Sequence, residues 1–344
     1  FISKKKENLK LLVPYIDKKK IQNIKKSFAI KYDFEIISIF EKSKELNFFK
    51  RLYFGYKCLK KIKKNKDINL VISRSVITGV ILAFSKIKSY TEIHTELKGF
   101  TKYFFLLTKI KFISKNLRFI LINKYLLNFF KLSKKKYIIL DDAVNNELFK
   151  DKRRKKFKNT CAYFGSLTKG KGVEIISKIS KLLKNINFHV YGDIKLISNK
   201  NIIKVKKNVK FFNYIKYSKI PDLMSRYEIL LMPYQRNVYV RSKNLDAAKY
   251  MSPLKLFEYL AMSKIVIASN LKVYSHILKN NKNSILVDPD NEKLWAKKIQ
   301  IILNNLNNFK YLKKNALLTS RKFTWEKRVD IILKNNRSFL KKSL

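Results

Sequence analysis

Short runs of β-forming residues alternate with longer helical stretches along the whole chain, and this alternation restricts the fold more than any other feature of the sequence. Most of the runs are apolar throughout, as in IVIA at Ile265–Ala268, and are typical of strands buried on both faces. Such strands in alternation with helices predict parallel sheets covered by helices. We therefore expect an α/β fold of doubly wound, Rossmann-like domains.

The alternation runs through both halves of the chain. In the first half we expect strands at Phe34–Phe40, Leu70–Ser73, Tyr90–His94 and Tyr137–Leu140, and helices at Lys18–Ile30, Phe48–Lys64, Val76–Lys86 and Tyr103–Phe112. In the second half we expect strands at Cys161–Phe164, Phe188–Tyr191, Val209–Phe212, Ile229–Met232, Ile265–Ala268 and Ser284–Val287. The helices expected between those strands are Val173–Leu183, Ile220–Ser225, Pro253–Met262, Val273–Leu278 and Glu292–Leu303.

The chain has 344 residues, enough for two domains. A dense run of basic residues with little apolar content lies between Asn146 and Lys158, and it predicts an exposed linker. We place the boundary there, so that the first domain covers residues 1–150 and the second begins at residue 151. The sequence starts at Phe1 without a methionine, so we expect the first domain to be truncated at its start.

The formal net charge is +54, from 78 Lys and Arg against 24 Asp and Glu, and this predicts anionic partners. A bias towards Lys, Ile, Asn, Phe and Tyr, as an AT-rich coding sequence gives, accounts for about half of that excess in our interpretation. The two cysteines, Cys58 and Cys161, lie far apart, so neither a disulfide framework nor a cysteine metal site is indicated. A reducing, cytoplasmic compartment fits best.

The most apolar region, Tyr103–Leu132, is interrupted repeatedly by Lys and Arg and never provides the roughly 20 apolar residues of a membrane span. Two interpretations stay open. The region can form core helices with lysines in water, or a basic apolar surface that rests on an anionic membrane at the inner face of the cell membrane.

Ligands of doubly wound sheets bind beyond the carboxyl ends of the strands, so the loops after strands are the candidate sites. The first such loop, GSLTKGKGVE from Gly165, follows a strand and precedes a helix, and it holds three of the seven glycines of the chain. Glycines let the backbone approach an oxyanion, the helix end offers N–H groups, and Lys171 adds a positive charge suited to a diphosphate. The alternative is an ordinary turn with lysines in solvent.

The second loop is SPLKLFEY from Ser252. Ser252 is the expected N-cap and Pro253 the first residue of a helix, which places Lys255 and Glu258 three residues apart on one face. An ammonium group there can meet a phosphate, and a carboxylate can accept hydrogen bonds from both hydroxyls of a ribose. The alternative is an ion pair on the helix surface worth a few tenths of a kcal/mol.

These two segments, GSLTKGKGVE and SPLKLFEYLAMSKIVIAS, in this order, resemble the family-four, group 1 retaining glycosyltransferases of the GT-B fold. Four further segments agree with that family: LDDAVNNELF at Leu140–Phe149, LLMPY at Leu230–Tyr234, NSILVDPDN at Asn283–Asn291, and FTWE from Phe323. The resemblance covers most of Thr160–Leu333 and extends more weakly into the first half.

The resemblance implies two Rossmann-like domains that face a cleft, with residues 151–322 holding a nucleotide-diphosphate sugar. It also implies that residues 323–344 form a helix that crosses back to the first, acceptor-side domain. By position, Lys171 and Glu258 are expected to act on the donor, together with His94 of the EIH strand end in the first domain. The residues expected to line the phosphate and sugar pocket are Gly165, Ser166, Gly170, Gly172, Ser252, Pro253, Leu254 and Lys255.

The sequence departs from the family pattern at several positions. Tyr250 stands where the family often has a first glutamate, Ser166 where a basic residue is common, Ala143 where a glycine is expected, and His276 where a glutamate is common. Cations and helix-end amides can stabilise the charge that develops on a leaving phosphate without a metal or other cofactor. Carboxylate pairs at Asp141-Asp142 and Asp288-Asp290 read as turns rather than metal ligands.

The predicted function is sugar transfer from a nucleotide-diphosphate sugar to a lipid-linked or polysaccharide acceptor, in surface polysaccharide, lipopolysaccharide or glycolipid synthesis, with retention implied by the family. Two alternatives stay open. The charge could serve nucleic-acid binding, although the lysines are spread along the chain and no nucleic-acid motif is present. The chain could also be a non-catalytic GT-B relative.

Overall fold

The computed structural model describes residues 8–27, 30, 33–42, 46–65, 67–152, 154–197, 207–240 and 243–341. The chain forms two compact units: Phe1–Asp141 with Glu326–Leu344 (unit 1), and Asp142–Trp325 (unit 2). Each unit is an α/β structure built on parallel strands, as the alternation in the sequence predicts.

Unit 1 contains a four-stranded parallel sheet in the order β3-β4-β5-β6 and a separate parallel pair, β1-β2. The strands are β1 (Lys10–Val13), β2 (Glu35–Ser38), β3 (Ile72–Ser73), β4 (Ser89–Ile93), β5 (Leu117–Leu121) and β6 (Tyr137–Ile139). The helices are α1 (Lys18–Ser27), α2 (Phe48–Lys63), α3 (Val76–Phe84), α4 (Phe100–Leu107), α5 (Lys111–Asn116) and α6 (Lys124–Phe130), followed by a 3-10 turn at Lys134–Lys136.

The region Tyr103–Leu132 is more complex than one expected helix. The expected helix Tyr103–Phe112 is replaced by α4 and α5 with a break around Thr108, and the strand β5 follows at once. Every residue of β5 pairs with β4, and four of its five side chains are buried. An apolar strand between two others is stabilised by neighbours distant in sequence, which local periodicity does not reveal.

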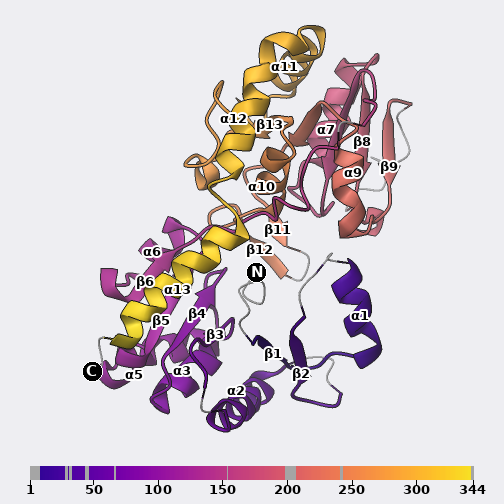
Figure 1. Ribbon diagram of the computed structural model, residues 1–344. Helices are drawn as coiled ribbons and strands as arrows, with labels where there is room; N and C mark the ends of the chain where they lie inside the picture. Colours follow the sequence, from indigo (N-terminus) through magenta and orange to yellow (C-terminus); the bar gives the residue numbers. More distant parts are fainter. Residues whose placement is uncertain are drawn as a thin grey trace. The chain divides into compact units, whose positions relative to one another are not determined.

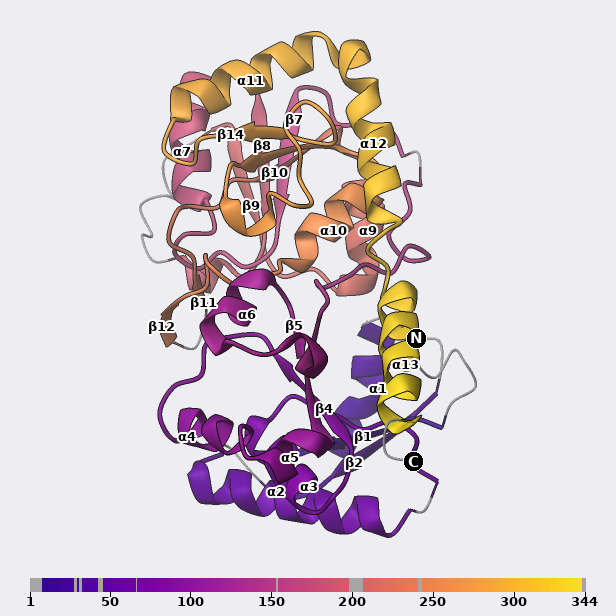
Figure 2. The same cartoon turned by 90° about the vertical axis from the view of Figure 1, so that its left-hand side faces the viewer.

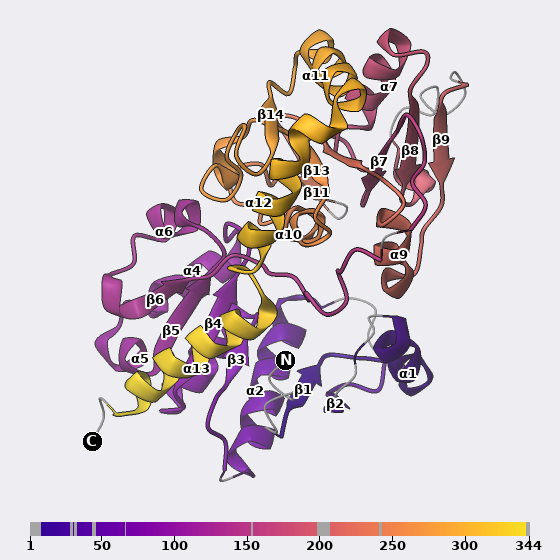
Figure 3. The ribbon, with the colours of Figure 1, turned by 45° about the horizontal axis from the view of Figure 1, so that its top comes forward.

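The last helix, α13 (Trp325–Lys341), packs on unit 1 (Figure 3). Its Asn336 side chain donates to the carbonyl of Asn69 at 2.7 Å, and Phe339 meets the ring of Tyr90 edge-on, with 5.6 Å between centroids. The crossing of the C-terminal helix to the first unit, which the resemblance implies, is present.

Unit 2 is a six-stranded parallel sheet in the order β14-β13-β10-β7-β8-β9. Its strands are β7 (Thr160–Phe164), β8 (Asn187–Tyr191), β9 (Val209–Phe212), β10 (Ile229–Met232), β13 (Ile265–Ser269) and β14 (Ile285–Val287). The chain builds outwards from β7 to β9 and then returns to add β10 on the other side of β7. The order therefore reverses between β7 and β10, where doubly wound sheets bind their ligands.

Helices cover both faces of this sheet (Figures 1 and 2). On one face α7 (Val173–Leu182) packs against α11 (Glu292–Asn304), and on the other α10 (Leu254–Ala261) packs against α12 (Lys310–Ser320). Trp295 of α11 is fully buried in the core that α7 and α11 form with the strands. The remaining elements are α9 (Ile220–Met224), an antiparallel pair β11 (Tyr239–Val240) and β12 (Lys243–Asp246), and 3-10 turns at Ile194–Leu196, Tyr217–Lys219, Lys272–Tyr274 and Leu306–Phe309.

Two expectations for unit 2 are corrected. In place of the expected helix Val273–Leu278, the structure has only the 3-10 turn Lys272–Tyr274. After this turn, the N–H groups of Ile277 and Leu278 both donate to the Tyr274 carbonyl. The basic run at residues 146–158 belongs to unit 2 rather than forming a linker, since Lys152 N–H donates to Ser225 Oγ and Phe157 N–H to the Arg226 carbonyl. The units divide after Asp141 and Trp325, where sequence reasoning placed the boundaries after residues 150 and 322.

Candidate donor-binding site

The candidate site lies where β7 and β10 end side by side in unit 2. The turn from Gly165 to Gly172 leaves β7 and leads into α7, whose N-cap is Gly172. Gly172 has a φ of +96°, and a Cβ there would lie 2.1 Å from the carbonyl oxygen of Pro233, directly after β10. Only glycine fits this position, and it brings the turn down onto the end of β10.

Lys255 and Lys171 converge on this turn from different elements. A Cβ at Gly165, which has a φ of +140°, would lie 2.5 Å from Lys255 Nζ, so the lysine from α10 reaches up to the glycine. The ammonium of Lys255 lies 3.6 Å from the ring centroid of Tyr163 and 5.0 Å from that of Tyr234, and the ammonium of Lys171 lies 4.6 Å from that of Tyr234. Two cations therefore share one tyrosine ring.

Burial disfavours the charged form of both ammonium groups. Only 8% of Lys255 is exposed, and its Nζ has no hydrogen-bond partner among the described residues. Burial, followed by the charge of Lys171, holds the pKa of Lys255 well below its usual value although Glu258 opposes the shift, and burial lowers the pKa of Lys171 to about 8. A buried cation is costly unless an anion meets it. The region around these two ammonium groups therefore favours the binding of a negatively charged ligand.

Glu258 lies one helical turn after Lys255 and is also buried, at 7% exposed. Its Oε1 accepts a hydrogen bond from the hydroxyl of Tyr217 at 2.7 Å. Burial raises the pKa of Glu258 to about 7, against the opposing effects of the Tyr217 hydrogen bond and the Lys255 charge. The alternative of a surface ion pair between Lys255 and Glu258 is wrong, because both side chains are buried in the body of the unit.

The start of α10 differs from the prediction. Pro253 is the N-cap and the helix begins at Leu254, so Ser252 is not the cap. The Ser252 hydroxyl accepts a hydrogen bond from the backbone N–H of Asp142 at 2.9 Å instead. Ser252 thus fixes the first residue of unit 2 next to the loop that precedes α10.

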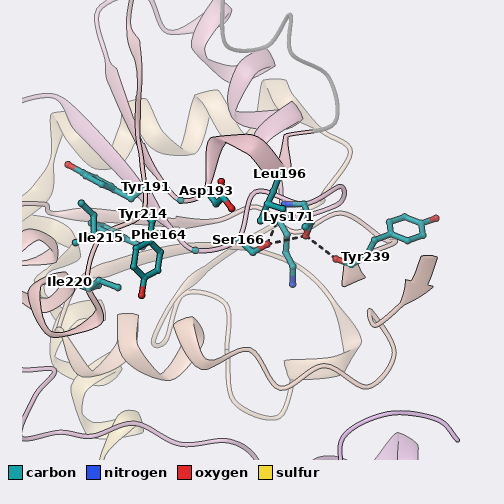
Figure 4. Close-up of a pocket in the computed structure, with 13 residues that line it drawn as sticks. Phe164, Ser166, Lys171, Tyr191, Asp193, Leu196, Tyr214, Ile215, Ile220 and Tyr239 are labelled. Carbon is teal, nitrogen blue, oxygen red and sulfur yellow. Dashed lines mark hydrogen bonds between the residues drawn. The ribbon is translucent and has the colours of Figure 1, made fainter. Parts of the chain in front are cut away.

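A pocket of about 470 Å³ opens beside the turn (Figure 4). Gly165, Ser166 and Lys171 all line it, so the structure brings these three predicted residues together. In Figure 4 Ser166 and Lys171 lie at one end and Phe164, Tyr191 and Tyr214 at the other. The other lining residues are Thr168, Gly192, Asp193, Leu196, Ile215, Ile220 and Tyr239. The pocket therefore combines a cationic end with an aromatic end.

The aromatic end rests on a stack of rings from neighbouring strands. Phe164 and Tyr191 lie parallel with centroids 4.5 Å apart, and Tyr191 stacks on Phe212 at 4.6 Å. The hydroxyl of Tyr259 bridges the backbone of Phe164, accepting from its N–H at 2.7 Å and donating to its carbonyl at 3.2 Å. The end of β7 is thereby fixed to α10, the helix that carries Lys255.

Gly170 lies in the same turn but outside the pocket lining, where a Cβ would come 2.0 Å from the carbonyl oxygen of Asn237. Sequence reasoning missed Gly192, Tyr217 and Tyr234. A Cβ at Gly192 would lie 2.2 Å from the Gly165 carbonyl oxygen, so the loops after β7 and β8 touch there. The sequence did offer a signal for this contact, because Gly192 directly follows a predicted strand in a chain that has few glycines.

His94 belongs to unit 1, directly after β4, whereas the residues above all belong to unit 2. Its Nε2 lies 2.5 Å from Glu92 Oε1, and the same oxygen accepts from Arg328 of α13 at 3.2 Å. Burial disfavours the charge of Glu92, but the hydrogen bond and electrostatic interaction with His94 and the positive charges of Arg328 and Arg74 outweigh it and lower the pKa of Glu92 to about 2. The role expected for His94 at the donor stays a prediction.

The carboxylates of Asp288 and Asp290 pair with one arginine. Arg236 forms ion pairs with Asp288 at 3.0 Å and Asp290 at 2.5 Å. Over the described ranges, no group of three or more His, Cys, Asp or Glu residues is arranged to hold a metal ion, and no helix has the length and apolar content to cross a membrane. The expected independence from metals stays a prediction.

Residues 144–319 match the family model of the group 1 glycosyl transferases, and this segment is more than half of the chain. The chain belongs to the group 1 glycosyltransferase family. It is 26% identical over 214 residues to an uncharacterized glycosyltransferase of Methanocaldococcus jannaschii, MJ1178, a match that spans 61% of this chain and 56% of that relative. Membership in this family confirms the resemblance that the sequence segments indicate.

Solved structures confirm the GT-B fold. A glycosyltransferase from Rickettsia africae ESF-5 superposes with a TM-score of 0.74 at 18% identity, covering 97% of this chain and 99% of that one. Anabaena Alr3699/HepE in complex with UDP-glucose gives a TM-score of 0.66 at 12% identity, covering 97% and 92%. WaaG, a glycosyltransferase involved in lipopolysaccharide biosynthesis, gives 0.59 at 14% identity, covering 96% and 92%.

Proposed function

We propose that this protein transfers a sugar from a nucleotide-diphosphate sugar to an acceptor, and that unit 2 binds the donor. The observation that carries the proposal is the pair of ammonium groups, of the buried Lys255 and the half-buried Lys171, beside the switch point of the sheet. A diphosphate brings the negative charge that this pair lacks, and the turn at Gly165 and Ser166 brings backbone within reach of it.

The rest of the pocket suits the other parts of such a donor. The stacked rings at the aromatic end provide a flat apolar surface for a nucleobase. Glu258 does not line the pocket; oriented by Tyr217, its carboxylate is proposed to accept hydrogen bonds from ribose hydroxyls, which would favour its ionised form. Because HepE is described in complexes with UDP and UDP-glucose, uridine nucleotides are the first donors to test.

The chemistry follows from the charges. Breaking the bond between sugar and diphosphate leaves negative charge on the departing phosphate, and cations held in a dry site stabilise that charge in the transition state. Lys171, Lys255 and the N–H groups at the start of α7 would do this without a metal. His94 is proposed to face the donor sugar, and retention of the anomeric configuration is proposed from the family alone.

The proposed acceptor is a lipid-linked or polysaccharide chain in surface polysaccharide or lipopolysaccharide synthesis, at the inner face of the cell membrane. WaaG is described as a glycosyltransferase involved in lipopolysaccharide biosynthesis, and this description supports an acceptor of that kind.

A panel of UDP- and GDP-sugars, read by melting-temperature shift and by mass spectrometry of products, tests the proposal. We expect that UDP or GDP stabilises the wild type and that Lys171→Ala loses this stabilisation. Lys178→Ala, which removes an exposed lysine from α7, the helix that follows Lys171, should keep it. Stabilisation by DNA instead would favour the nucleic-acid alternative. Donor binding with unchanged background hydrolysis in Lys171→Ala and Glu258→Gln would favour a non-catalytic relative.

A further inference from the structure

Helix α4 of unit 1 turns an apolar stripe towards solvent. Phe100, Tyr103 and Leu107 follow one another at the spacing of one helix face, and they are 66%, 66% and 39% exposed. Ile110, in the turn after the helix, is 51% exposed. Of the residues of α4 only Phe105 is buried. A helix of a soluble domain normally buries such a stripe in the core, so this exposure calls for a partner.

Neighbouring helices add further exposed aromatic rings to this stripe. Phe48 at the start of α2 contacts Phe100, with 5.0 Å between ring centroids, and the adjacent Phe49 is 76% exposed. On the other side Phe112 of α5 meets the exposed Phe84 of α3 edge-on at 6.1 Å. Figure 2 shows these four helices close together in unit 1. We call this surface the α4 patch; its members are Phe49, Phe84, Phe100, Tyr103, Leu106, Leu107, Ile110 and Phe112.

The segment that carries most of the α4 patch is rich in lysine. Residues 97–116 contain five lysines and no acidic residue. All five are exposed: Lys98, Lys102, Lys109, Lys111 and Lys115. The sequence of α2 likewise contains basic residues and no acidic ones. These lysines favour a partner that is apolar and carries negative charge.

We propose that the α4 patch docks on an anionic lipid bilayer, with its aromatic side chains among the acyl chains and its lysines against the headgroups. A bilayer satisfies both requirements at once, because apolar burial and headgroup attraction add together. A second copy of this chain is a poor occupant, since the copies carry a net charge of +54 each and would bring identical lysines face to face.

This proposal does not rest on donor binding, because the α4 patch belongs to unit 1 and the donor pocket to unit 2. If the patch docks on a membrane, an acceptor carried by a lipid is delivered to the unit expected to bind acceptors. The two proposals can therefore fail separately.

Co-sedimentation of the whole chain with vesicles tests the proposal. The probes are vesicles of phosphatidylcholine alone and of equal parts phosphatidylcholine and phosphatidylglycerol. We expect binding to the anionic vesicles that weakens with added salt, and little binding to the neutral ones. At about 1 kcal/mol per cation near the surface, Lys102→Glu should weaken binding about fivefold or more.

The apolar contribution needs its own variants. Phe100→Ser with Tyr103→Ser should reduce vesicle binding roughly tenfold or more and leave the circular dichroism and the UDP-induced melting shift unchanged. Leu318→Ser, an exposed apolar position on α12 of unit 2, is the matched control and should bind vesicles like the wild type. Equal binding of the patch variants would overturn the proposal. So would a dimer in analytical ultracentrifugation that the same variants dissolve, because the patch would then be a self-association surface.

Discussion

Replacing Lys255 by methionine should make the protein more stable and abolish donor binding. The ammonium of Lys255 is buried, has no hydrogen-bond partner among the described residues, and lies near the second cation of Lys171. Methionine keeps most of the length of the side chain and its contacts with the rings of Tyr163 and Tyr234, but it removes an ammonium group whose desolvation no hydrogen bond offsets.

The expected gain in the free energy of unfolding is about 1–3 kcal/mol, the cost of one buried unsatisfied polar group. For a unit of this size, each kcal/mol corresponds to about 2–4 °C in melting temperature. The loss in donor binding is larger, because a buried, hydrogen-bonded charge contact to phosphate is worth about 2–5 kcal/mol, or roughly 30-fold or more in the dissociation constant.

Thermal melting with and without UDP measures both effects in one experiment. We expect Lys255→Met to melt higher than the wild type in buffer and to show no shift with UDP. Lys178→Met, an exposed lysine on α7, should change neither quantity. A variant that melts lower than the wild type and still responds to UDP would show that Lys255 is an ordinary structural lysine, and the reasoning would be refuted.

Three further predictions concern the same pocket. Burial lowers the pKa of Lys171 to about 8 from 10.5, so between these values the unfolded chain binds a proton that the folded protein does not. The free energy of unfolding should therefore rise with pH across this window. Denaturant titrations at several pH values measure this rise, and Lys171→Met should lose the part of it that Lys171 contributes. Tyr217→Phe removes a hydrogen bond that favours the ionised form of Glu258, so the pKa of Glu258, about 7, should rise further. The pH midpoint of UDP binding, followed by calorimetry, should then move upwards. An unmoved midpoint would show that Glu258 does not contact the donor. Sugar transfer should persist after dialysis against EDTA, since the cations proposed to stabilise the leaving diphosphate are side chains; activity that returns only with added Mg²⁺ or Mn²⁺ would contradict this.

The parallel sheets could be predicted because their strands are short apolar runs that need no knowledge of their neighbours. The pattern of β7, β8, β10 and β13 is visible locally, and so is the glycine turn after β7. By contrast, β5 follows α5 without a turn signal and is stabilised by β4 and β6 on its two sides, so its sequence alone does not distinguish it from the helices around it.

The spacing of Lys255 and Glu258 predicts that they share a helix face, but not that this face is buried. Burial follows from α12, which covers α10, and from the tyrosines that surround the two side chains. Tyr217 reaches Glu258 from a loop 41 residues earlier in the chain, a contact that only the folded unit creates. The sequence of Tyr103–Leu132 does not decide between core and surface, and the structure divides the region. β5 is buried, while most side chains of α4 are exposed.

The central claim is that the turn after β7 binds a diphosphate between Lys171 and Lys255. A crystal structure of the complex with UDP tests it most directly. We predict phosphate oxygens within hydrogen-bond distance of both Nζ atoms and above Gly165, with the uracil towards Phe164 and Tyr191. A diphosphate bound elsewhere, with both ammonium groups still packed on the ring of Tyr234 and no anion beside them, would contradict the account.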